Sequence, residues 1–268
     1  MERLEQIRRL NALLLEELPQ YRAFADRFGP DEASQRRLLR SLMNLCPPMP
    51  LSPGYLALQD ALLSAEREER GVVEAAALPA VEADPRVCLW RGDVTRLAAD
   101  AVVNAANGAL LGCFHPCHGC IDNAIHSAAG LQLREECARL MRLQGCEEPP
   151  GRAKLTPGYN LPSRYVLHTV GPIVSGPLRP EDCALLASCY RSCLALAAER
   201  GLASVAFCCI STGEYRFPAD RAAEIAVGTV RAFLQSNEIR VIFNVFKESD
   251  EALYRRLLGP DRPAGPGA

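Results

Sequence analysis

Apolar residues recur at helical spacing through the first quarter of the chain. Residues 4–18 place leucine or isoleucine at every third or fourth position, which predicts an amphipathic helix. A second helix is expected from Pro30 until the prolines at 47, 48 and 50 stop it, and a third runs from Ser52-Pro53 to Arg70. No catalytic constellation occurs in this part. We therefore expect residues 1–82 to form a helical N-terminal extension that caps the main domain.

From about Pro85 the pattern changes to short apolar runs that alternate with amphipathic stretches. Strands are expected at 87–90, 100–103, 154–156, 165–169, 204–210 and 240–246, and helices at 120–143, 181–200, 219–235 and 250–258. This alternation predicts a layered α/β domain over residues 83–258. The almost wholly apolar runs at 204–210 and 240–246 predict a sheet covered on both faces. Residues 259–268 are rich in Pro and Gly, and we expect a disordered tail there.

Three loops follow the ends of predicted strands, at residues 91–95, 104–119 and 211–218. In sheets covered on both faces, ligands bind outside the carboxyl ends of the strands. The third loop begins Ser-Thr-Gly before a helix, where free backbone N–H groups can receive an anion. The same triplet is common in ordinary turns, so it is a weak signal alone. The chain contains no P-loop and no GxGxxG pattern.

The second loop is dense in metal-ligating side chains. Cys113, His118 and Cys120 form a C-x4-H-x-C pattern, and thiolate and imidazole are preferred zinc ligands. His115 and Cys117 lie between them and could join or replace them. Since no second half-site occurs elsewhere, we expect one local, open zinc site per chain. The alternative is an ordinary loop of small buried cysteines and solvated histidines.

Asp122 follows this cluster, near the expected start of a helix. It could cap the helix or favour its dipole, or it could hold or activate a water molecule near a metal. The residue type leaves both roles open. His126 and Ser127 on the same helix are weaker signals, and we expect His126 to be packed or hydrogen-bonded.

Composition bears on the class of partner. The 268 residues carry a formal net charge of −2, which gives no strong field toward nucleic acid or an anionic membrane. The charged N-terminus lacks the apolar core of a signal peptide, and no apolar run approaches the roughly 20 residues of a membrane span. The 12 cysteines are too dilute for a disulfide scaffold, so reduced thiols are expected. These features predict a soluble cytoplasmic protein without nucleic-acid or membrane partners.

Four ordered motifs resemble the macrodomain family. They are Gly92-Asp-Val-Thr95, Val102-Val-Asn104-Ala-Ala-Asn107, Asp122-Asn-Ala-Ile-His126-Ser-Ala-Ala-Gly130, and Ile210-Ser-Thr-Gly-Glu-Tyr215 followed by Pro218. The resemblance covers about residues 85–258. It implies a three-layer α/β/α fold with a mixed sheet that binds ADP-ribose.

One departure from the usual hydrolytic members of that family is informative. They carry a glycine-rich run before the motif aspartate, whereas this chain has Gly112-Cys-Phe-His-Pro-Cys-His-Gly-Cys120. The stretch is similar to the zinc-dependent, microbial subclass that is often linked to sirtuin-type ADP-ribosyltransferases and is preceded by a helical extension. Glu214 and Phe217 also resemble this subclass. The resemblance selects Cys113, His118 and Cys120 as zinc ligands and leaves His115 and Cys117 as loop residues.

The resemblance also implies roles for the cleft residues. Asp93 would accept from the adenine amino group, with the N–H of Val94 nearby. Asn107 would contact the distal ribose, supported by Asn104. Asp122 matches the catalytic aspartate of related hydrolases, and we take Asp122 and Asn107 as the catalytic candidates. The diphosphate cradle would comprise Ser211, Thr212, Gly213, Glu214 and Tyr215.

The implied function is a zinc-dependent hydrolase of the glycosidic or ester type that removes mono-ADP-ribose from modified protein side chains. The resemblance favours Asp or Glu acceptors and makes a lipoyl-carrier protein one candidate substrate. Two alternatives stay open. One is a non-catalytic ADP-ribose-binding module with structural zinc, and the other is an O-acetyl-ADP-ribose deacetylase.

Overall fold

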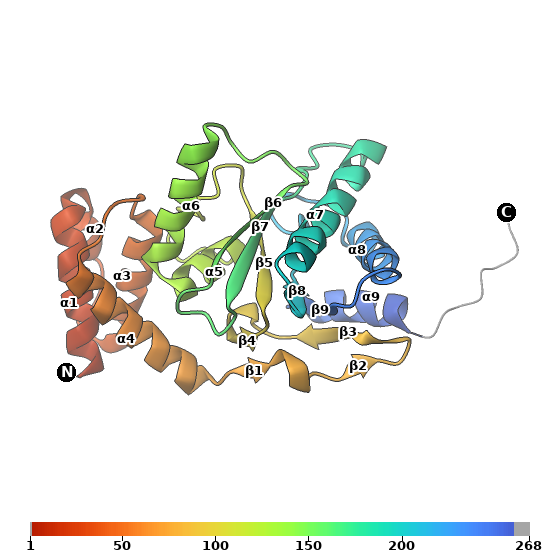
Figure 1. The fold of residues 1–268 in the computed structure, drawn as a ribbon. Coiled ribbons are helices and arrows are strands. Elements are labelled where there is room, and N and C mark those ends of the chain that lie inside the picture. Colours follow the sequence, from red (N-terminus) through yellow and green to blue (C-terminus); the bar gives the residue numbers. More distant parts are fainter. Residues whose placement is uncertain (1, 260–268) are drawn as a thin grey trace, which may run out of the picture.

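The first four helices gather at one end of the molecule. The computed structural model describes residues 2–259, and helices α1 (Arg3–Glu17), α2 (Arg22–Ala25), α3 (Glu32–Leu45) and α4 (Pro53–Arg70) pack together there (Figure 1). Their shared core includes Ile7, Leu10, Leu42 and Leu62, together with Leu131 from the main domain. The apolar stripes that predicted these helices therefore face one another, and Leu131 joins their core to the rest of the protein.

A seven-stranded mixed sheet forms the centre of the main domain, in the order β2-β3-β9-β8-β5-β7-β6. The strands are β2 (Ala80–Val81), β3 (Asp84–Arg91), β5 (Ala101–Ala106), β6 (Ala153–Pro157), β7 (Tyr165–Val170), β8 (Ser204–Phe207) and β9 (Arg240–Val245). The five inner strands are parallel, while β2 and β6 pair antiparallel at the two edges. Parallel inner strands bring five carboxyl ends to one side of the sheet.

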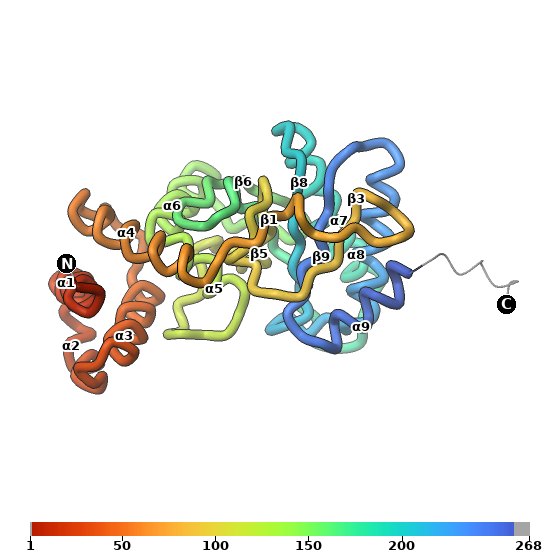
Figure 2. Tube along the Cα trace, turned by 90° about the horizontal axis from the view of Figure 1, so that it is seen from below, coloured from red at the N-terminus to blue at the C-terminus, as the bar shows by residue number. Residues whose placement is uncertain are grey.

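Helices cover both faces of this sheet. Helices α7 (Pro180–Glu199), α8 (Ala219–Leu234) and α9 (Glu248–Leu258) pack on one face, and α5 (Ile121–Ala129) and α6 (Leu131–Gln144) pack on the other (Figures 1 and 2). Two separate apolar cores result, with Tyr190 and Phe207 in the first and Ile125 and Leu133 in the second. The predicted three-layer α/β/α architecture with a mixed sheet and a helical N-terminal segment is confirmed.

Three details of the predicted elements were wrong. Residues 73–81 form no α-helix, because β1 (Val73–Glu74) pairs with β4 (Leu97–Ala98) and β2 joins the edge of the main sheet. The strand predicted over 204–210 ends at Phe207. The single helix predicted over 120–143 is two helices, α5 and α6. Short 3-10 turns occupy Pro19–Tyr21, Ala75–Ala77 and Val94–Arg96.

The break between α5 and α6 is made by Gly130. Its φ is +97°, a conformation that L side chains rarely adopt. A Cβ there would lie 2.6 Å from both Gln59 Nε2 and Gln132 Oε1. Both helices place apolar residues in the same core, so apolar positions recur on both sides of Gly130 and the apolar pattern alone did not reveal the break.

In residues 2–259, no helix is both long and apolar enough to cross a membrane. Of the tail predicted to be disordered at 259–268, residues 260–268 lie outside the described range.

Gly130→Ala should lower the free energy of unfolding by about 1–3 kcal/mol, because the new Cβ meets two side chains and the backbone is left-handed. Gly228→Ala is the matched control. Gly228 lies inside α8 with open space around its Cα, so alanine there should stabilise by about 0.5–1 kcal/mol. Urea denaturation of both variants measures the difference, and equal stabilities would contradict this account of the helix break.

Candidate functional site

A cleft of about 1060 Å³ lies at the carboxyl ends of the inner strands. Residues that follow β3, β5, β7, β8 and β9 line it, and so do residues at the start of α5. All three loops that the sequence placed after strand ends contribute to its wall. Parallel pairing explains this convergence, because it brings segments far apart in sequence to one edge of the sheet.

Asp122 is the buried carboxylate of the cleft. It lies in the first turn of α5, lines the cleft, and is only 5% exposed. Asn104 Nδ2 donates to its Oδ1 at 2.8 Å, and Asn107 Nδ2 lies 3.4 Å from its Oδ2. Burial raises the pKa of Asp122 to about 6, against the opposing effects of the Asn104 hydrogen bond and the positive charge of Arg134. The side-chain amides of Asn104 and Asn107 therefore orient the Asp122 carboxylate at the N-terminus of α5.

A buried polar network fixes the amide of Asn104. Asn104 is fully buried on β5, and its Nδ2 also lies 3.2 Å from His168 Nδ1. His168 Nε2 in turn lies 2.9 Å from Thr156 Oγ1. If the proton of His168 is on Nε2, its Nδ1 accepts from Asn104, and the same amide nitrogen can then donate to Asp122. Burial lowers the pKa of His168 to about 3, so the ring is neutral.

His126 belongs to the same buried layer. Its Nε2 lies 3.5 Å from Asp122 Oδ1, and neither ring nitrogen has a hydrogen-bond partner among the described residues. Burial lowers the pKa of His126 well below its usual range. His126, His168 and Cys137 form a compact group of potential ligands, but none of them lines the cleft. Both nitrogens of His168 are already in contact with Asn104 and Thr156. The two histidines therefore pack around Asp122, His126 by direct contact and His168 through Asn104.

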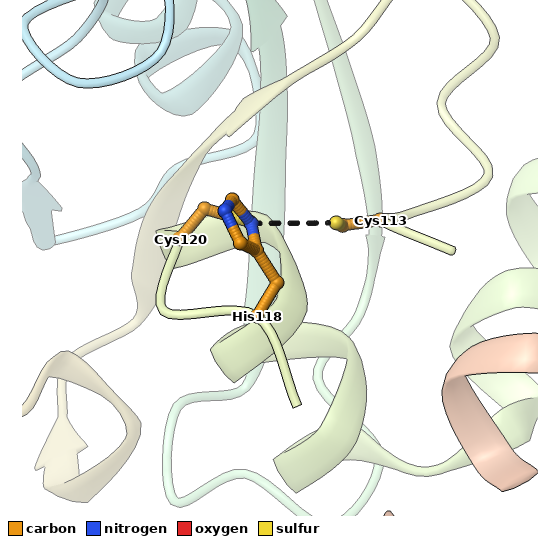
Figure 3. A group of neighbouring side chains, drawn as sticks. All are labelled: Cys113, His118 and Cys120. Atoms are coloured by element: carbon orange, nitrogen blue, oxygen red, sulfur yellow. Dashed lines mark hydrogen bonds between the residues drawn. The ribbon is translucent and has the colours of Figure 1, made fainter. Parts of the chain in front are cut away.

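The second loop brings three metal-type donors together at the cleft wall. The ligand atoms of Cys113, His118 and Cys120 all lie within 4.8 Å of one another (Figure 3). Cys113 Sγ is 3.6 Å from His118 Nδ1. Two donors of a tetrahedral zinc site with bonds of about 2.1–2.3 Å lie about 3.6 Å apart, so this geometry suits zinc. All three side chains line the cleft, which leaves one side of the group facing its interior.

The other two candidate ligands of the loop lie outside this group. Cys117 Sγ contacts Arg37 O at 3.6 Å and Ser41 Oγ at 3.4 Å, both on α3. His115 is exposed, and its ring centroid is 5.8 Å from that of His118. The residue pattern alone left five candidates open, and the fold separates them because the chain turns at Cys117 (φ +52°).

The third loop has the form of an anion cradle. Ser211 has a φ of +65°, and its hydroxyl is buried without a partner among the described residues. The loop closes through Arg216 N to Gly213 O and Phe217 N to Ser211 O, both at 3.0 Å. Within residues 2–259, no hydrogen bond uses the backbone N–H of Gly213, Glu214 or Tyr215. Converging free N–H groups on a left-handed turn bind anions well.

Asp93 also lines the cleft, shortly after β3. One of its carboxylate oxygens caps the turn that contains Val94, accepting from Thr95 N at 2.9 Å and Thr95 Oγ1 at 2.7 Å. Its Oδ2 lies 3.4 Å from Arg70 Nη1 of α4, and its side chain is 40% exposed. One carboxylate oxygen is thus structural, and the other can accept from a ligand.

Sequence reasoning missed Phe246. We expected it to end a buried strand, but β9 stops at Val245 and Phe246 is 77% exposed at the rim of the cleft. An exposed aromatic ring next to a cleft can stack on a planar base. Its apolar character continued the strand pattern, so only the fold distinguishes it from a core residue.

Comparison with known proteins identifies related sequences along nearly the whole chain. The Macro domain family matches residues 103–226. A Protein-ADP-ribose hydrolase of Treponema medium is 52% identical over 249 residues, which are 91% of this chain and 95% of that protein. A protein of the same name from Staphylococcus aureus is 48% identical over 84% of this chain and 85% of its own length.

Solved structures show the same fold. The Trypanosoma brucei macrodomain in complex with ADP-ribose matches with a TM-score of 0.64 and 36% identity, over 82% of this chain and 95% of that one. The Oceanobacillus iheyensis macrodomain with ADP matches with a TM-score of 0.59 and 40% identity, over 64% of this chain and 89% of that one. The second match spans less of this chain than the first.

Proposed function

The chain belongs to the Macro domain family, and we propose that it is a hydrolase that removes mono-ADP-ribose from modified proteins. The observation that carries the proposal is the shared cleft. The anion cradle, the buried Asp122 carboxylate and the three metal-type donors all line it. His118 Nε2 lies 3.5 Å from Glu214 Oε1, so the metal-type group and the cradle adjoin. The similarity to the Treponema medium protein named Protein-ADP-ribose hydrolase extends over 91% of the chain.

The residues that line the cleft favour one orientation of bound ADP-ribose. The adenine would lie at Asp93, Val94 and Phe246, where a carboxylate can accept from its amino group and a ring can stack on the base. The diphosphate would lie on the backbone of the cradle, made by Ser211, Thr212, Gly213, Glu214 and Tyr215. The distal ribose would then reach Asn107 and Asp122.

We propose one zinc ion per chain, held by Cys113 Sγ, His118 Nδ1 and Cys120 Sγ. The separation of Cys113 and His118 and the open side of the group support this set. Zinc bound there would supply Lewis acidity next to the distal ribose. Glu214 can accept from His118 Nε2–H, which would fix the ring so that Nδ1 faces the metal.

Asp122 and Asn107 would act on the reacting end of the ligand. Asn104 and Asn107 orient the Asp122 carboxylate, which can hold a water molecule against the distal ribose. Hydrolysis of an Asp- or Glu-linked ADP-ribose consumes one water and returns the free carboxylate and ADP-ribose. The resemblance of the motifs supports Asp or Glu side chains as the residues that carry the ADP-ribose, and a lipoyl-carrier protein as a candidate substrate.

Release of ADP-ribose from an aspartate- or glutamate-modified protein tests the proposed activity. We expect release to stop with a chelator and to return when zinc is added, because the metal-type group adjoins the reacting end. Quantifying free ADP-ribose by chromatography measures it. Tight ADP-ribose binding without release would instead indicate a binding module, and release from O-acetyl-ADP-ribose alone would indicate the small-molecule enzyme.

Zinc content tests the ligand assignment. Cys113→Ala and His118→Ala should each reduce the metal from one ion per chain to well below that, because each removes one of three ligands. Cys117→Ala is the matched control and should keep its zinc, because its sulfur faces α3. Metal analysis of the purified proteins measures this, and retention of zinc in all three variants would refute the assignment.

Asp93→Asn should separate the two roles of that carboxylate. Asparagine can still cap the turn through one oxygen, but its amide nitrogen would face the adenine amino group. Loss of a hydrogen bond to a charged group, about 1.5–3 kcal/mol, predicts roughly 10- to 100-fold weaker ADP-ribose binding by calorimetry. Asp220→Asn, an exposed aspartate of α8 outside the cleft, should bind normally. Equal affinities would remove Asp93 from the site.

A further inference from the structure

The N-terminal helical segment reaches the loop that carries the metal-type donors. Three side chains of α3, those of Arg40, Ser41 and Asn44, contact residues of the loop 113–120 or the helix that follows it. The sequence left open whether the extension covers the cleft or only adds to the core. The contacts place α3 behind the loop, on the side away from the cleft.

Asn44 makes the most buried of these contacts. It is 1% exposed, and its Oδ1 accepts from Cys117 N at 2.8 Å. Its Nδ2 donates to Ser127 Oγ on α5 at 3.0 Å. One amide thus joins α3, the loop and α5. The loop residue that it holds is Cys117, whose left-handed backbone (φ +52°) turns the chain between His115 and His118.

Arg40 holds the loop through a second hub, Asn123. The guanidinium donates to Asn123 Oδ1 at 2.8 Å and lies 3.4 Å from His118 O. Asn123 is fully buried and donates through Nδ2 to His115 O at 2.9 Å. The backbone N–H of Asn123 lies 3.4 Å from Cys120 Sγ. Arg40 therefore contacts one of the three metal-type residues, His118, directly and a second, Cys120, through Asn123.

Arg134 ties the start of the loop to the end of α3. Its guanidinium is buried and donates to Leu111 O at 2.7 Å and to Met43 O at 2.8 Å, and it also contacts the carbonyl of Cys46. A cation at the C-terminal end of a helix is favoured by the helix dipole. Phe114 of the loop packs on this guanidinium, 4.5 Å from ring centroid to Cζ.

The loop has little support of its own. Between residues 113 and 120, the only internal backbone hydrogen bond among the described residues runs from His118 N to His115 O, at 3.2 Å. Three donors that must meet within a few tenths of an ångström need more support than one internal backbone hydrogen bond. The hydrogen bonds from α3 supply the missing constraint.

We propose that α3 positions the metal loop, with Asn44 and Arg40 as positioning residues for Cys113, His118 and Cys120. The inference rests on the proposed zinc site, because its consequence is the affinity of those three donors for the metal. The N-terminal helices are then part of the site, although none of their residues lines the cleft.

Asn44→Ala tests the proposal, with Asn11→Ala as its matched control. Asn11 is a buried asparagine of α1 that donates only within the extension, to Gln35 of α3. Amide hydrogen exchange of residues 113–120 should quicken in metal-free Asn44→Ala and stay unchanged in Asn11→Ala. Zinc affinity, measured by chelator competition on the full chain, should fall about 10- to 100-fold in Asn44→Ala only. Asn44→Asp keeps the acceptor for Cys117 N–H and should restore most of the affinity.

The two readouts separate this inference from the proposed function. If the wild-type protein binds no zinc, the proposed metal site is wrong. The amide hydrogen exchange rates of residues 113–120 then still show whether α3 constrains the loop. Equal exchange and equal zinc affinity in Asn44→Ala and Asn11→Ala would overturn the inference. If Asn44→Ala does not fold, Arg40→Gln takes its place, because Arg40 is partly exposed and its loss leaves no cavity in the core.

Discussion

The hydrogen bond between Asn104 and Asp122 joins the sheet to the helix on which the site is built. Asn104 is fully buried on the inner strand β5, and Asp122 is at the first turn of α5. A carboxylate with so little access to water requires such donors. His168 orients the Asn104 amide from the next strand, so the position of the carboxylate depends on the register of two parallel strands.

The loop between these two residues is built differently. It is anchored at its ends by β5 and α5, and between them α3 constrains it from outside through Asn44 and Arg40. On the cleft side, Glu214 of the anion cradle approaches His118. The metal-type donors therefore lie where three independent parts of the fold meet. A site of this kind can combine a preorganised carboxylate with a loop that depends on its neighbours.

The N-terminal helical segment contacts the main domain in two ways, one apolar and one polar. Its apolar core is that of a small helical bundle, and Leu131 is its only buried apolar link to the main domain in the described residues. The polar contacts that Asn44 and Arg40 of α3 make are more specific than that apolar link, because they end on residues of the loop or of α5. The extension thus contributes stability through leucine packing and order through a few buried amides and guanidinium groups.

The sequence by itself predicted the pattern of helices and strands, a layered α/β domain and the loops that follow strand ends, because periodicity depends on residues close in the chain. The three-layer fold with a mixed sheet was implied by the resemblance of the motifs. The order of strands in the sheet is tertiary, since it pairs strands far apart in the chain, such as β3 and β9. It also placed Cys113, His118 and Cys120 in one short segment. Tertiary structure alone decided that Cys117 turns to α3, that Phe246 is exposed, and that Gly130 divides a helix. The partners in these cases are remote, as Asn44 and Cys117 are, 73 residues apart. Packing brings such groups together, and no local pattern encodes which amide will meet which backbone group.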